Sequence, residues 1–418
     1  MNESIPVGSF QGMKSLNKSV ILNIVRQYGP ISRAKIAKLT KLTPPTVTNL
    51  VAELIESRLV VESNLGESTG GRKPILLRLN SSAFYVIGVY AGAKRVKAVT
   101  ATLDGEVSKQ AETRYPNNFT QEEFLEILIL TIEKVIAAED CKIESFLGIG
   151  VGMHGLVDPE QGLSLFAPHL NLRDIPIKKE LEMKFNMPVE VENDICAQAL
   201  AESWFGKGSG TDNFVTVHIG TGVGAGIIIG NKLYHGASYT AGEIGHATID
   251  CNGPKCSCGN YGCLESFVGG NALAKRAQQA IGLGKESIVE KWVKGDLEKI
   301  NGEMLFRAAQ QNDSLAIEIL ADTGRYLGIG LANLVNTLNP ALIILSGGVS
   351  KAGEFILQPL IKTLERRALT KPAYAVTITV SELGENSMAI GAFTLLLAKL
   401  FTPEGLVGAA TESKKIYF

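Results

Sequence analysis

Four side chains that can bind a metal ion lie close together in the sequence: His246, Cys256, Cys258 and Cys263. Three thiolates and one imidazole satisfy the tetrahedral coordination of Zn²⁺, and four protein ligands leave no open position for a metal-bound water. We therefore expect a structural zinc site. Cys251 is a further thiol that could replace His246 as the fourth ligand, and the alternative to a metal is a cluster of buried free thiols.

A glycine-rich run at residues 220–226, Gly-Thr-Gly-Val-Gly-Ala-Gly, lies between two apolar stretches. Glycine allows positive φ angles and a close approach of the backbone, and successive N–H groups can bind an anion or a polar ligand. Both flanking stretches are typical of strands, whereas a dinucleotide fingerprint joins a strand to a helix, so a nicotinamide cofactor is not expected. A purely structural hairpin is the alternative.

The composition is that of a folded chain of two or three domains, with 418 residues, 45% hydrophobic and 20% charged. It excludes a disordered tail, a collagenous repeat and a disulfide-stapled miniprotein. The net charge of −1 is unevenly divided, because residues 1–80 hold eleven Lys and Arg against five Asp and Glu, net +6, which leaves −7 for the rest. No apolar run reaches the roughly 18 residues of a membrane span, so we expect a cytoplasmic protein without a membrane partner.

The basic N-terminal residues predict three helices. Apolar residues at helical spacing over residues 17–28 predict the first, which Gly29-Pro30 ends. Ser32 is a good N-cap for a second helix over residues 33–40, and Thr43 begins a third. Helices joined by a short turn and followed by a polar-faced helix are the helix-turn-helix pattern, in which the second helix of the pair enters the major groove of DNA.

A β-hairpin is predicted from the strand-like residues 59–61 and 75–79, which a turn-rich stretch separates. With this hairpin, the N-terminal residues are predicted to form a winged helix-turn-helix. Short polar side chains on the third helix suit base edges, and a flexible basic segment after two glycines suits phosphates or the minor groove. The residues expected to bind DNA are Ser32, Arg33, Thr43, Thr46, Thr48, Asn49, Arg72 and Lys73. The alternative is a small helical docking domain with solvated lysines.

Beyond residue 82, candidate strands and helices alternate, which predicts an α/β fold with mixed sheets in two similar lobes. The expected strands are 84–90, 96–103, 147–151, 189–191, 214–219, 226–229, 341–345 and 376–380, and the expected helices are 122–138, 195–205, 314–338 and 354–367. We expect a DNA-binding domain at 1–80, a first lobe at 81–200 that a helix near 385–400 completes, and a second lobe at 201–384 with the zinc site and the dimerisation helices.

Residues 242–246, Gly-Glu-Ile-Gly-His, and the run Cys256-x-Cys258-Gly-x-x-Gly-Cys263-x-Glu265 follow the 220–226 loop. Together these motifs resemble the signature of the ROK family of repressors and sugar kinases. With a helix-turn-helix in front, the chain resembles the repressor branch, which includes the xylose and N-acetylglucosamine repressors. The resemblance covers nearly the whole chain and implies a two-lobed, actin-like sugar-kinase fold.

The resemblance also implies which residues bind a sugar between the lobes: Asn193, Asp194, Glu243, His246, Glu265 and Gly155. Carboxylates and amides suit sugar hydroxyls, because they accept and donate hydrogen bonds in a cleft. His246 would bind zinc through one ring nitrogen and turn the other N–H toward the sugar. His154 stands where the kinases usually have proline, and it either borders the sugar pocket or packs within its loop.

In the kinases of the family, the aspartate that matches Asp194 is the base that activates the sugar hydroxyl. Those enzymes also need a phosphate loop of the type Asp-x-Gly-Gly-Thr, whereas residues 90–94 here read Tyr-Ala-Gly-Ala-Lys. Phosphoryl transfer depends on positioning and on charge neutralisation, so this loss should remove most turnover of ATP. We therefore expect no catalytic residue, and interpret Asp194 as an acceptor for a sugar hydroxyl.

These features predict a sugar-responsive repressor of carbohydrate-utilisation genes, such as those of xylose metabolism. The family and operator symmetry imply a homodimer or a dimer of dimers on a palindromic operator, with recognition helices about one DNA turn apart. One alternative is a sugar kinase with a regulatory head. Another is a repressor that a protein partner releases from DNA.

Overall fold

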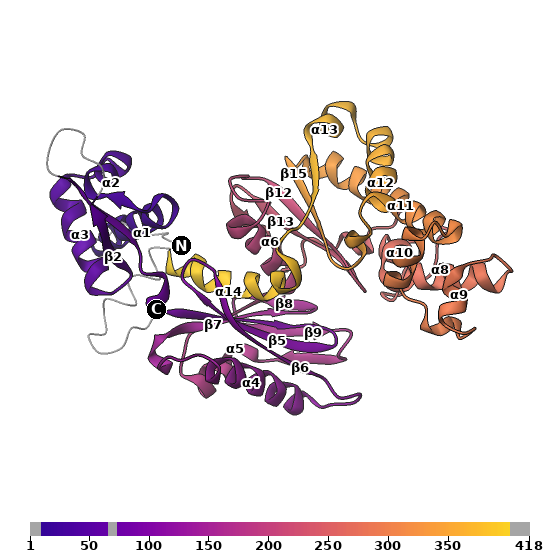
Figure 1. Ribbon diagram of the computed structural model, residues 1–418, viewed down its shortest axis with the longest axis horizontal. Helices are drawn as coiled ribbons and strands as arrows, with labels where there is room; N and C mark the ends of the chain where they lie inside the picture. The colour runs from indigo at the N-terminus through magenta and orange to yellow at the C-terminus, as the bar shows by residue number, and fades with distance from the viewer. Residues whose placement is uncertain (1–9, 66–72, 402–418) are drawn as a thin grey trace, which may run out of the picture. The chain divides into compact units, whose positions relative to one another are not determined.

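The computed structural model describes residues 10–65 and 73–401, which divide into two compact units (Figure 1). The first unit ends at Ala197 and also takes in the C-terminal segment from Asn386, whereas the second runs from Gln198 to Glu385. Within the described ranges, no helix is long and apolar enough to span a membrane.

The first unit begins with three helices, α1 (Phe10–Tyr28), α2 (Arg33–Thr40) and α3 (Pro44–Glu56). Ser32 caps α2 by accepting a hydrogen bond from the Lys35 N–H at 3.2 Å. Thr43 caps α3 in the same way, with the Thr46 N–H as donor. A small sheet of order β1-β3-β2 follows, formed by β1 (Ile31–Ser32), β2 (Val60–Leu65) and β3 (Ile75–Leu79). The helices and the hairpin that the sequence predicts are thus present.

The central sheet of the first unit has the order β11-β7-β4-β5-β6. Its strands are β4 (Tyr85–Ala91), β5 (Arg95–Thr102), β6 (Val107–Arg114), β7 (Phe146–Met153) and β11 (Val189–Asn193). β4, β5 and β6 pair antiparallel, whereas β7 pairs in parallel with β4 and β11. α4 (Gln121–Ala137) and α5 (Ile177–Phe185) pack against this sheet, and β8 (Leu156–Asp158), β9 (Leu163–Ala167) and β10 (Leu172–Ile175) form a smaller one.

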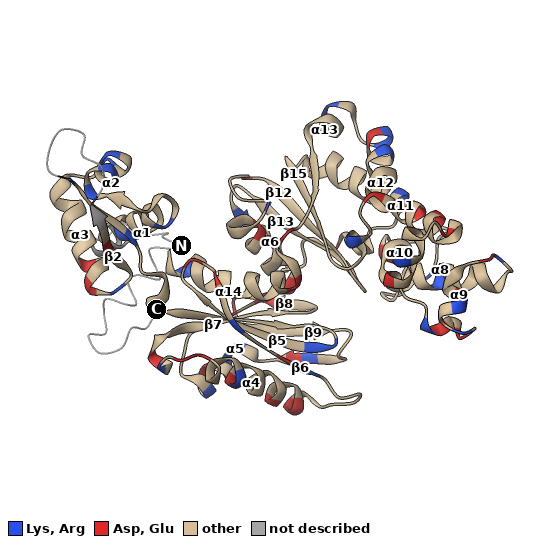
Figure 2. Ribbon diagram, in the orientation of Figure 1, with Lys and Arg blue, Asp and Glu red and all other residues tan. Residues whose placement is uncertain are grey.

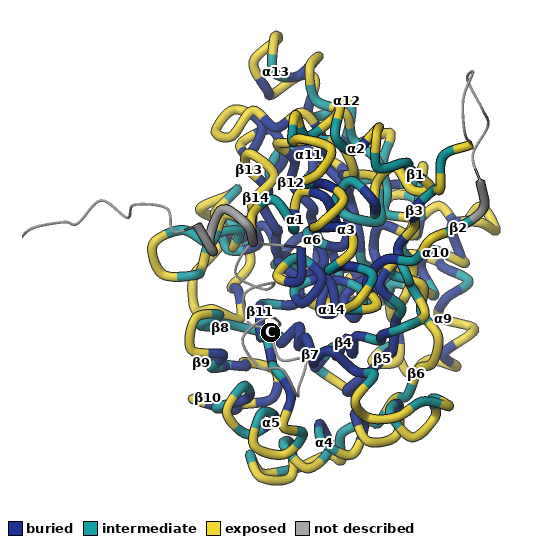
Figure 3. Tube along the Cα trace, turned by 90° about the vertical axis from the view of Figure 1, so that its left-hand side faces the viewer, coloured by how far each residue is buried: buried dark blue, intermediate teal, exposed yellow. Residues whose placement is uncertain are grey.

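Helix α14 (Ser387–Leu400) comes from the far end of the chain and packs on β4 and β7. A Cβ atom at Gly150 would overlap the backbone of Ala392, so glycine is needed for this close approach. The helix and both strands are buried over most of their length (Figure 3). Just after the helix, the Phe401 carbonyl accepts a hydrogen bond from Asn23 Nδ2 of α1 at 3.0 Å. α14 therefore completes the core of the first unit, and the residue that follows it contacts α1.

The second unit contains a sheet of order β14-β13-β12-β15-β16. Its strands are β12 (Phe214–Ile219), β13 (Val223–Ile229), β14 (Lys232–Leu233), β15 (Leu342–Ser346) and β16 (Thr377–Val380). The helices are α6 (Asp194–Phe205), which begins in the first unit, α7 (Glu265–Val268), α8 (Gly270–Gly282), α9 (Ile288–Trp292), α10 (Gly302–Gln310), α11 (Ser314–Leu338), α12 (Glu354–Arg367) and α13 (Thr370–Ala375). α11 packs along α12 and shares a core with the sheet. The predicted α/β fold class is confirmed.

Candidate functional site

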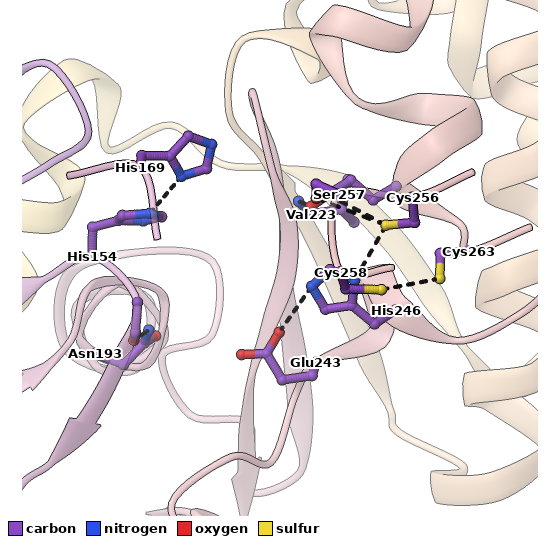
Figure 4. A network of polar contacts seen from close by, with 12 residues as sticks. His154, His169, Asn193, Val223, Glu243, His246, Cys256, Ser257, Cys258 and Cys263 are labelled. Atoms are coloured by element: carbon purple, nitrogen blue, oxygen red, sulfur yellow. Dashed lines mark hydrogen bonds and ion pairs between the residues drawn. The ribbon is translucent and has the colours of Figure 1, made fainter. Parts of the chain in front are cut away.

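The four predicted metal ligands lie together in the second unit (Figure 4). Their ligand atoms are all within 4.8 Å of one another. Cys258 Sγ is 3.8 Å from Cys263 Sγ, and Cys256 Sγ is 3.6 Å from His246 Nδ1. A tetrahedron with Zn–S bonds of about 2.3 Å and a Zn–N bond of about 2.05 Å has S–S and S–N edges of about 3.8 and 3.6 Å. The spacing of these side chains therefore fits tetrahedral Zn²⁺.

Backbone contacts shape the loop that presents the thiols. The Cys256 N–H donates to the Asn260 carbonyl at 2.7 Å, which closes a tight turn around Cys258. Gly262 has φ +67°, and a Cβ atom there would overlap the Asp250 carbonyl, so only glycine fits this position. Cys251 is exposed and is not among the clustered ligand atoms. The geometry thus favours His246 over Cys251 as the fourth ligand.

His246 lies between the thiol cluster and a carboxylate. It follows Glu243 in a short 3₁₀ turn (Ile244–His246), and its Nδ1 atom faces Cys256 while its Nε2 atom is 3.8 Å from Glu243 Oε2. Partial desolvation raises the pKa of Glu243 and the negative charge of Glu265 adds to the rise, which His246 opposes. One ring therefore connects the metal ligands to a residue of the predicted sugar site.

Glu265, at the start of α7, connects the same cluster to the glycine loop. Its Oε2 atom accepts a hydrogen bond from the Val223 N–H at 3.0 Å, and its Oε1 atom accepts one from Ser257 Oγ at 3.2 Å. β12 and β13 form the predicted strand-turn-strand around this loop, with Ile219 paired to Val223. In the second unit, the structure therefore brings together Glu243, His246 and Glu265.

The other three predicted sugar residues meet in the first unit. Asn193 is the last residue of β11 and Asp194 the first of α6, so both stand at the carboxyl end of a parallel strand, where ligands of α/β folds commonly bind. Asn193 Nδ2 donates to the Gly155 carbonyl at 2.8 Å. The Asp194 side chain is only 5% exposed. Asp194 Oδ1 accepts a hydrogen bond from the Ile195 N–H at 3.0 Å, so backbone contacts hold both this carboxylate and the Asn193 amide in place.

Tyr90 lies against the Gly92 turn, which belongs to the run 90–94 compared above with the phosphate loop of the kinases. A Cβ atom at Gly92 would overlap the ring and the hydroxyl of Tyr90, so the ring lies directly against this turn. Burial, chiefly, and the charge of Asp194 raise the pKa of Tyr90, and Arg95 opposes the rise. An aromatic ring therefore packs against the Gly92 turn, at the position where the resemblance to kinases leads us to expect an acidic residue.

A buried polar network at the ends of β12 and β15 was not anticipated from the sequence. Ser346 Oγ donates to Gln198 Oε1 at 2.9 Å and is 3.3 Å from His218 Nδ1. Burial lowers the pKa of His218 to about 4, so the ring is neutral near pH 7. These contacts connect α6 to two strands, and the only sequence signal was a polar residue at the end of each apolar strand.

In the N-terminal helices, several predicted DNA-binding residues have structural contacts of their own. Arg33 Nη2 forms an ion pair with Glu62 Oε1 of β2 at 2.7 Å, which connects α2 to the hairpin. Thr48 Oγ1 donates to the Pro44 carbonyl at 2.9 Å. Basic residues line α2 (Figure 2), and Asn49 and Lys73 are exposed. Arg72 lies outside the described residues.

Asn49→Ala is expected to weaken binding to the operator by about 1–3 kcal/mol and to leave binding to random DNA almost unchanged, because asparagine can bind adenine through two hydrogen bonds. Lys73→Ala should instead weaken binding to the operator and to random DNA by similar factors. It should also lower the salt dependence of binding, since a lysine that contacts a phosphate does not distinguish one base from another. Fluorescence anisotropy at several salt concentrations measures both. An equal loss on the two DNAs with Asn49→Ala would rule out base reading by this residue.

Comparisons with known proteins cover both the N-terminal helices and the α/β body. The sequence model of the ROK family matches residues 86–399. The xylose repressor of Caldicellulosiruptor bescii is 33% identical over 396 residues, which cover 95% of this chain and 99% of that protein. The DNA-binding transcriptional dual regulator NagC of Escherichia coli is 32% identical over 391 residues, 93% of this chain and 94% of that protein.

Two solved structures extend this comparison. A ROK family transcriptional regulator, a homologue of the E. coli MLC protein, matches with a TM-score of 0.84 and 28% identity, over 95% of this chain and 98% of the other. A ROK family glucokinase from Streptomyces griseus, in complex with glucose and AMPPNP, matches with a TM-score of 0.67 and 31% identity. The glucokinase match covers 98% of that enzyme but only 74% of this chain.

Proposed function

The chain belongs to the ROK family, and on that basis we propose that it is a DNA-binding transcriptional repressor whose operator binding is controlled by a sugar. The observation that supports this best is the extent of the similarity to regulators, which covers 95% of the chain for both the xylose repressor and the solved regulator. The glucokinase match covers 74% of the chain. Genes of carbohydrate utilisation, those for xylose among them, are the proposed targets.

Both polar clusters are proposed to bind the sugar. Asn193, Asp194 and Gly155 form the cluster of the first unit, and Glu243 with His246 and Glu265 forms that of the second. The carboxylates accept hydrogen bonds from sugar hydroxyls, and the Asn193 amide and the His246 ring can donate them. A neutral sugar is favoured, because neither cluster contains lysine or arginine.

Zinc is proposed as a structural cofactor, held by His246, Cys256, Cys258 and Cys263. A bound Zn²⁺ would supply the positive charge that keeps the thiolates together. Because the four protein side chains complete its coordination, no position is left for a water or a substrate. The protein's part is then to orient His246 Nε2 toward Glu243.

A regulator without kinase activity is proposed, since Tyr90 packs against the Gly92 turn. The retained Asp194 and the likeness to a glucokinase favour a sugar kinase as the second candidate. Incubation with ATP and each of xylose, glucose and N-acetylglucosamine distinguishes them, because a kinase would release ADP steadily. No ADP above the sugar-free background is the expected result.

A homodimer or a dimer of dimers on a palindromic operator is proposed for the assembly, since two-fold symmetric proteins match two-fold symmetric sites. The proposed location is the cytoplasm, where the operator is. The test begins with DNA fragments that the protein selects from a random library. One sugar should change the affinity for such a fragment at least about tenfold, a coupling typical of effectors. If no sugar or sugar phosphate changes it, control by a sugar is wrong and a protein partner becomes the better explanation.

A further inference from the structure

Two of the five histidines of the chain meet beside the polar cluster of the first unit. His154 directly follows β7, and His169 lies in the turn between β9 and β10. His169 Nδ1 is 2.7 Å from His154 Nε2, and the ring centroids are 4.7 Å apart (Figure 4). This nitrogen-to-nitrogen distance is that of a hydrogen bond, so one ring donates an N–H to a lone pair of the other.

The backbone fixes the position of His154. Its N–H donates to the Ala91 carbonyl at 3.0 Å, which holds the residue beside the end of β4. The next residue, Gly155, has φ +96°, and a Cβ atom there would overlap the Phe166 carbonyl of β9. The chain thus turns sharply after His154 and runs back against β9, whose following turn contains His169. The two rings therefore meet as a result of the fold of the small sheet.

The other side of the His154 ring faces Asp194. Its Nδ1 atom is 4.0 Å from Asp194 Oδ2, which is too long for a direct hydrogen bond. A single oxygen atom about 2.8 Å from both, at an angle of about 90°, spans this distance. A hydroxyl oxygen can accept a hydrogen bond from a ring N–H while its own hydrogen is donated to a carboxylate. The spacing therefore matches one hydroxyl group.

This arrangement requires the proton of His154 to be on Nδ1, and both contacts of the ring are compatible with that tautomer. The negative charge of Asp194 favours the N–H on the nitrogen that faces it. His154 Nε2 is then a lone pair, which accepts a hydrogen bond from His169 Nδ1. With its own proton on Nδ1, His169 supports the tautomer in which His154 is a donor toward Asp194.

We propose that His154 and Asp194 together bind one hydroxyl of the effector sugar and that His169 holds His154 in the donor tautomer, an inference that rests on the proposed sugar-binding function. The ligand class is a neutral sugar with a free hydroxyl at this position. A deoxy sugar lacks the oxygen, and an ether oxygen has no hydrogen to donate to Asp194. A proline in place of His154, as in the related kinases, would offer no such donor.

Isothermal titration calorimetry with xylose, glucose, N-acetylglucosamine and their monodeoxy analogues tests this. For the sugar that binds, removal of one hydroxyl should weaken binding to the wild-type protein by about 10–100-fold. In His154→Leu this penalty should become smaller, because the hydroxyl then has only its hydrogen bond to Asp194 to lose. His154→Asn should restore most of the discrimination, since its amide N–H can take the place of Nδ1–H. His169→Leu should retain only part of this discrimination between parent sugar and deoxy analogue, because His154 then lacks the partner that supports its donor tautomer.

Asp194→Asn provides the second, independent variant. The penalty for removing the same hydroxyl should also become smaller in this variant, because a neutral amide oxygen accepts a weaker hydrogen bond than a carboxylate. Operator binding without sugar reports whether each variant has folded. If neither His154→Leu nor Asp194→Asn reduces a deoxy penalty, or if the two variants reduce it for different hydroxyls, the shared hydroxyl is wrong while sugar binding stands. If the wild-type protein binds none of the sugars, the proposed function and this inference both fail.

Discussion

Replacement of Cys263 by serine is expected to reduce zinc from about one ion per chain to almost none, because a serine hydroxyl does not replace a thiolate in a tetrahedral site. Structural zinc contributes roughly 10 kcal/mol to the folding of small zinc domains, so losing even a third of this would lower the melting temperature of the second unit by roughly 10 °C. The loss should be large because Cys263 is fully buried and lies 3.8 Å from Cys258.

The matched control is Cys251→Ser, since Cys251 is exposed and outside the ligand cluster. Elemental analysis and thermal unfolding should show wild-type zinc and stability for this variant. The same pair of variants decides between the two candidates for the fourth ligand, when His246→Ala is added. Full zinc content in Cys263→Ser would contradict the assignment of Cys263 as a zinc ligand. Loss of zinc in Cys251→Ser, together with full zinc in His246→Ala, would show that Cys251 and not His246 is the fourth ligand.

The zinc variant should also respond poorly to the sugar. His246 Nδ1 faces Cys256 and its Nε2 faces Glu243, so a ring released from the metal no longer holds its orientation toward the sugar site. Disturbed support of this kind around a metal site commonly costs about 10–100-fold in affinity or activity. The effector concentration needed for half-maximal operator release should rise by a factor in this range.

Glu243→Gln is the second change with a large expected effect. The substitution keeps the size of the side chain and replaces one acceptor oxygen by a donor. Hydrogen bonds to a charged group contribute about 1.5–3 kcal/mol, so sugar affinity should fall by about 10–100-fold. Operator binding without sugar should be unchanged, because Glu243 belongs to the second unit and the N-terminal helices proposed to bind DNA belong to the first. Calorimetry and anisotropy measure the two affinities.

Glu298→Gln is a suitable control, since Glu298 is an exposed glutamate of the same unit at a different loop. It removes the same charge without touching the polar cluster. A Glu243→Gln protein with a normal response to sugar would show that this cluster does not bind the effector. A response lost equally in both variants would point to net charge as the cause.

The elements predicted correctly from the sequence are those with local signals. α2 begins and ends at the predicted residues because its start is set by a local contact, the cap that Ser32 forms with the Lys35 N–H. The clustering of the four candidate metal ligands has an equally local signal, since a single loop after His246 provides all three thiols. The bounds of α11 follow from one long apolar periodicity that ends at Asn339, which takes up a left-handed conformation.

Features that depend on contacts between distant segments were not predictable in detail. The small sheet of β8, β9 and β10 has strands too short for a periodic pattern, so its turn with His169 was missed. His154 and His169 come together only when this sheet folds. The only feature noted in the sequence was a histidine at position 154, where the kinases of the family usually have proline. The unusual residues around the Gly92 turn were visible in the sequence, but the position of the Tyr90 ring over it was not.

The packing of α14 on β4 and β7 affects the order in which the protein can fold during synthesis. The ribosome makes α14 after every other described element, so the sheet surface that it buries stays uncovered while the rest of the chain emerges. The second unit is one continuous stretch and needs no later segment, so it can complete its core first. Nascent chains are therefore expected to expose an apolar sheet of the first unit for most of their synthesis, which makes this surface a natural binding site for chaperones.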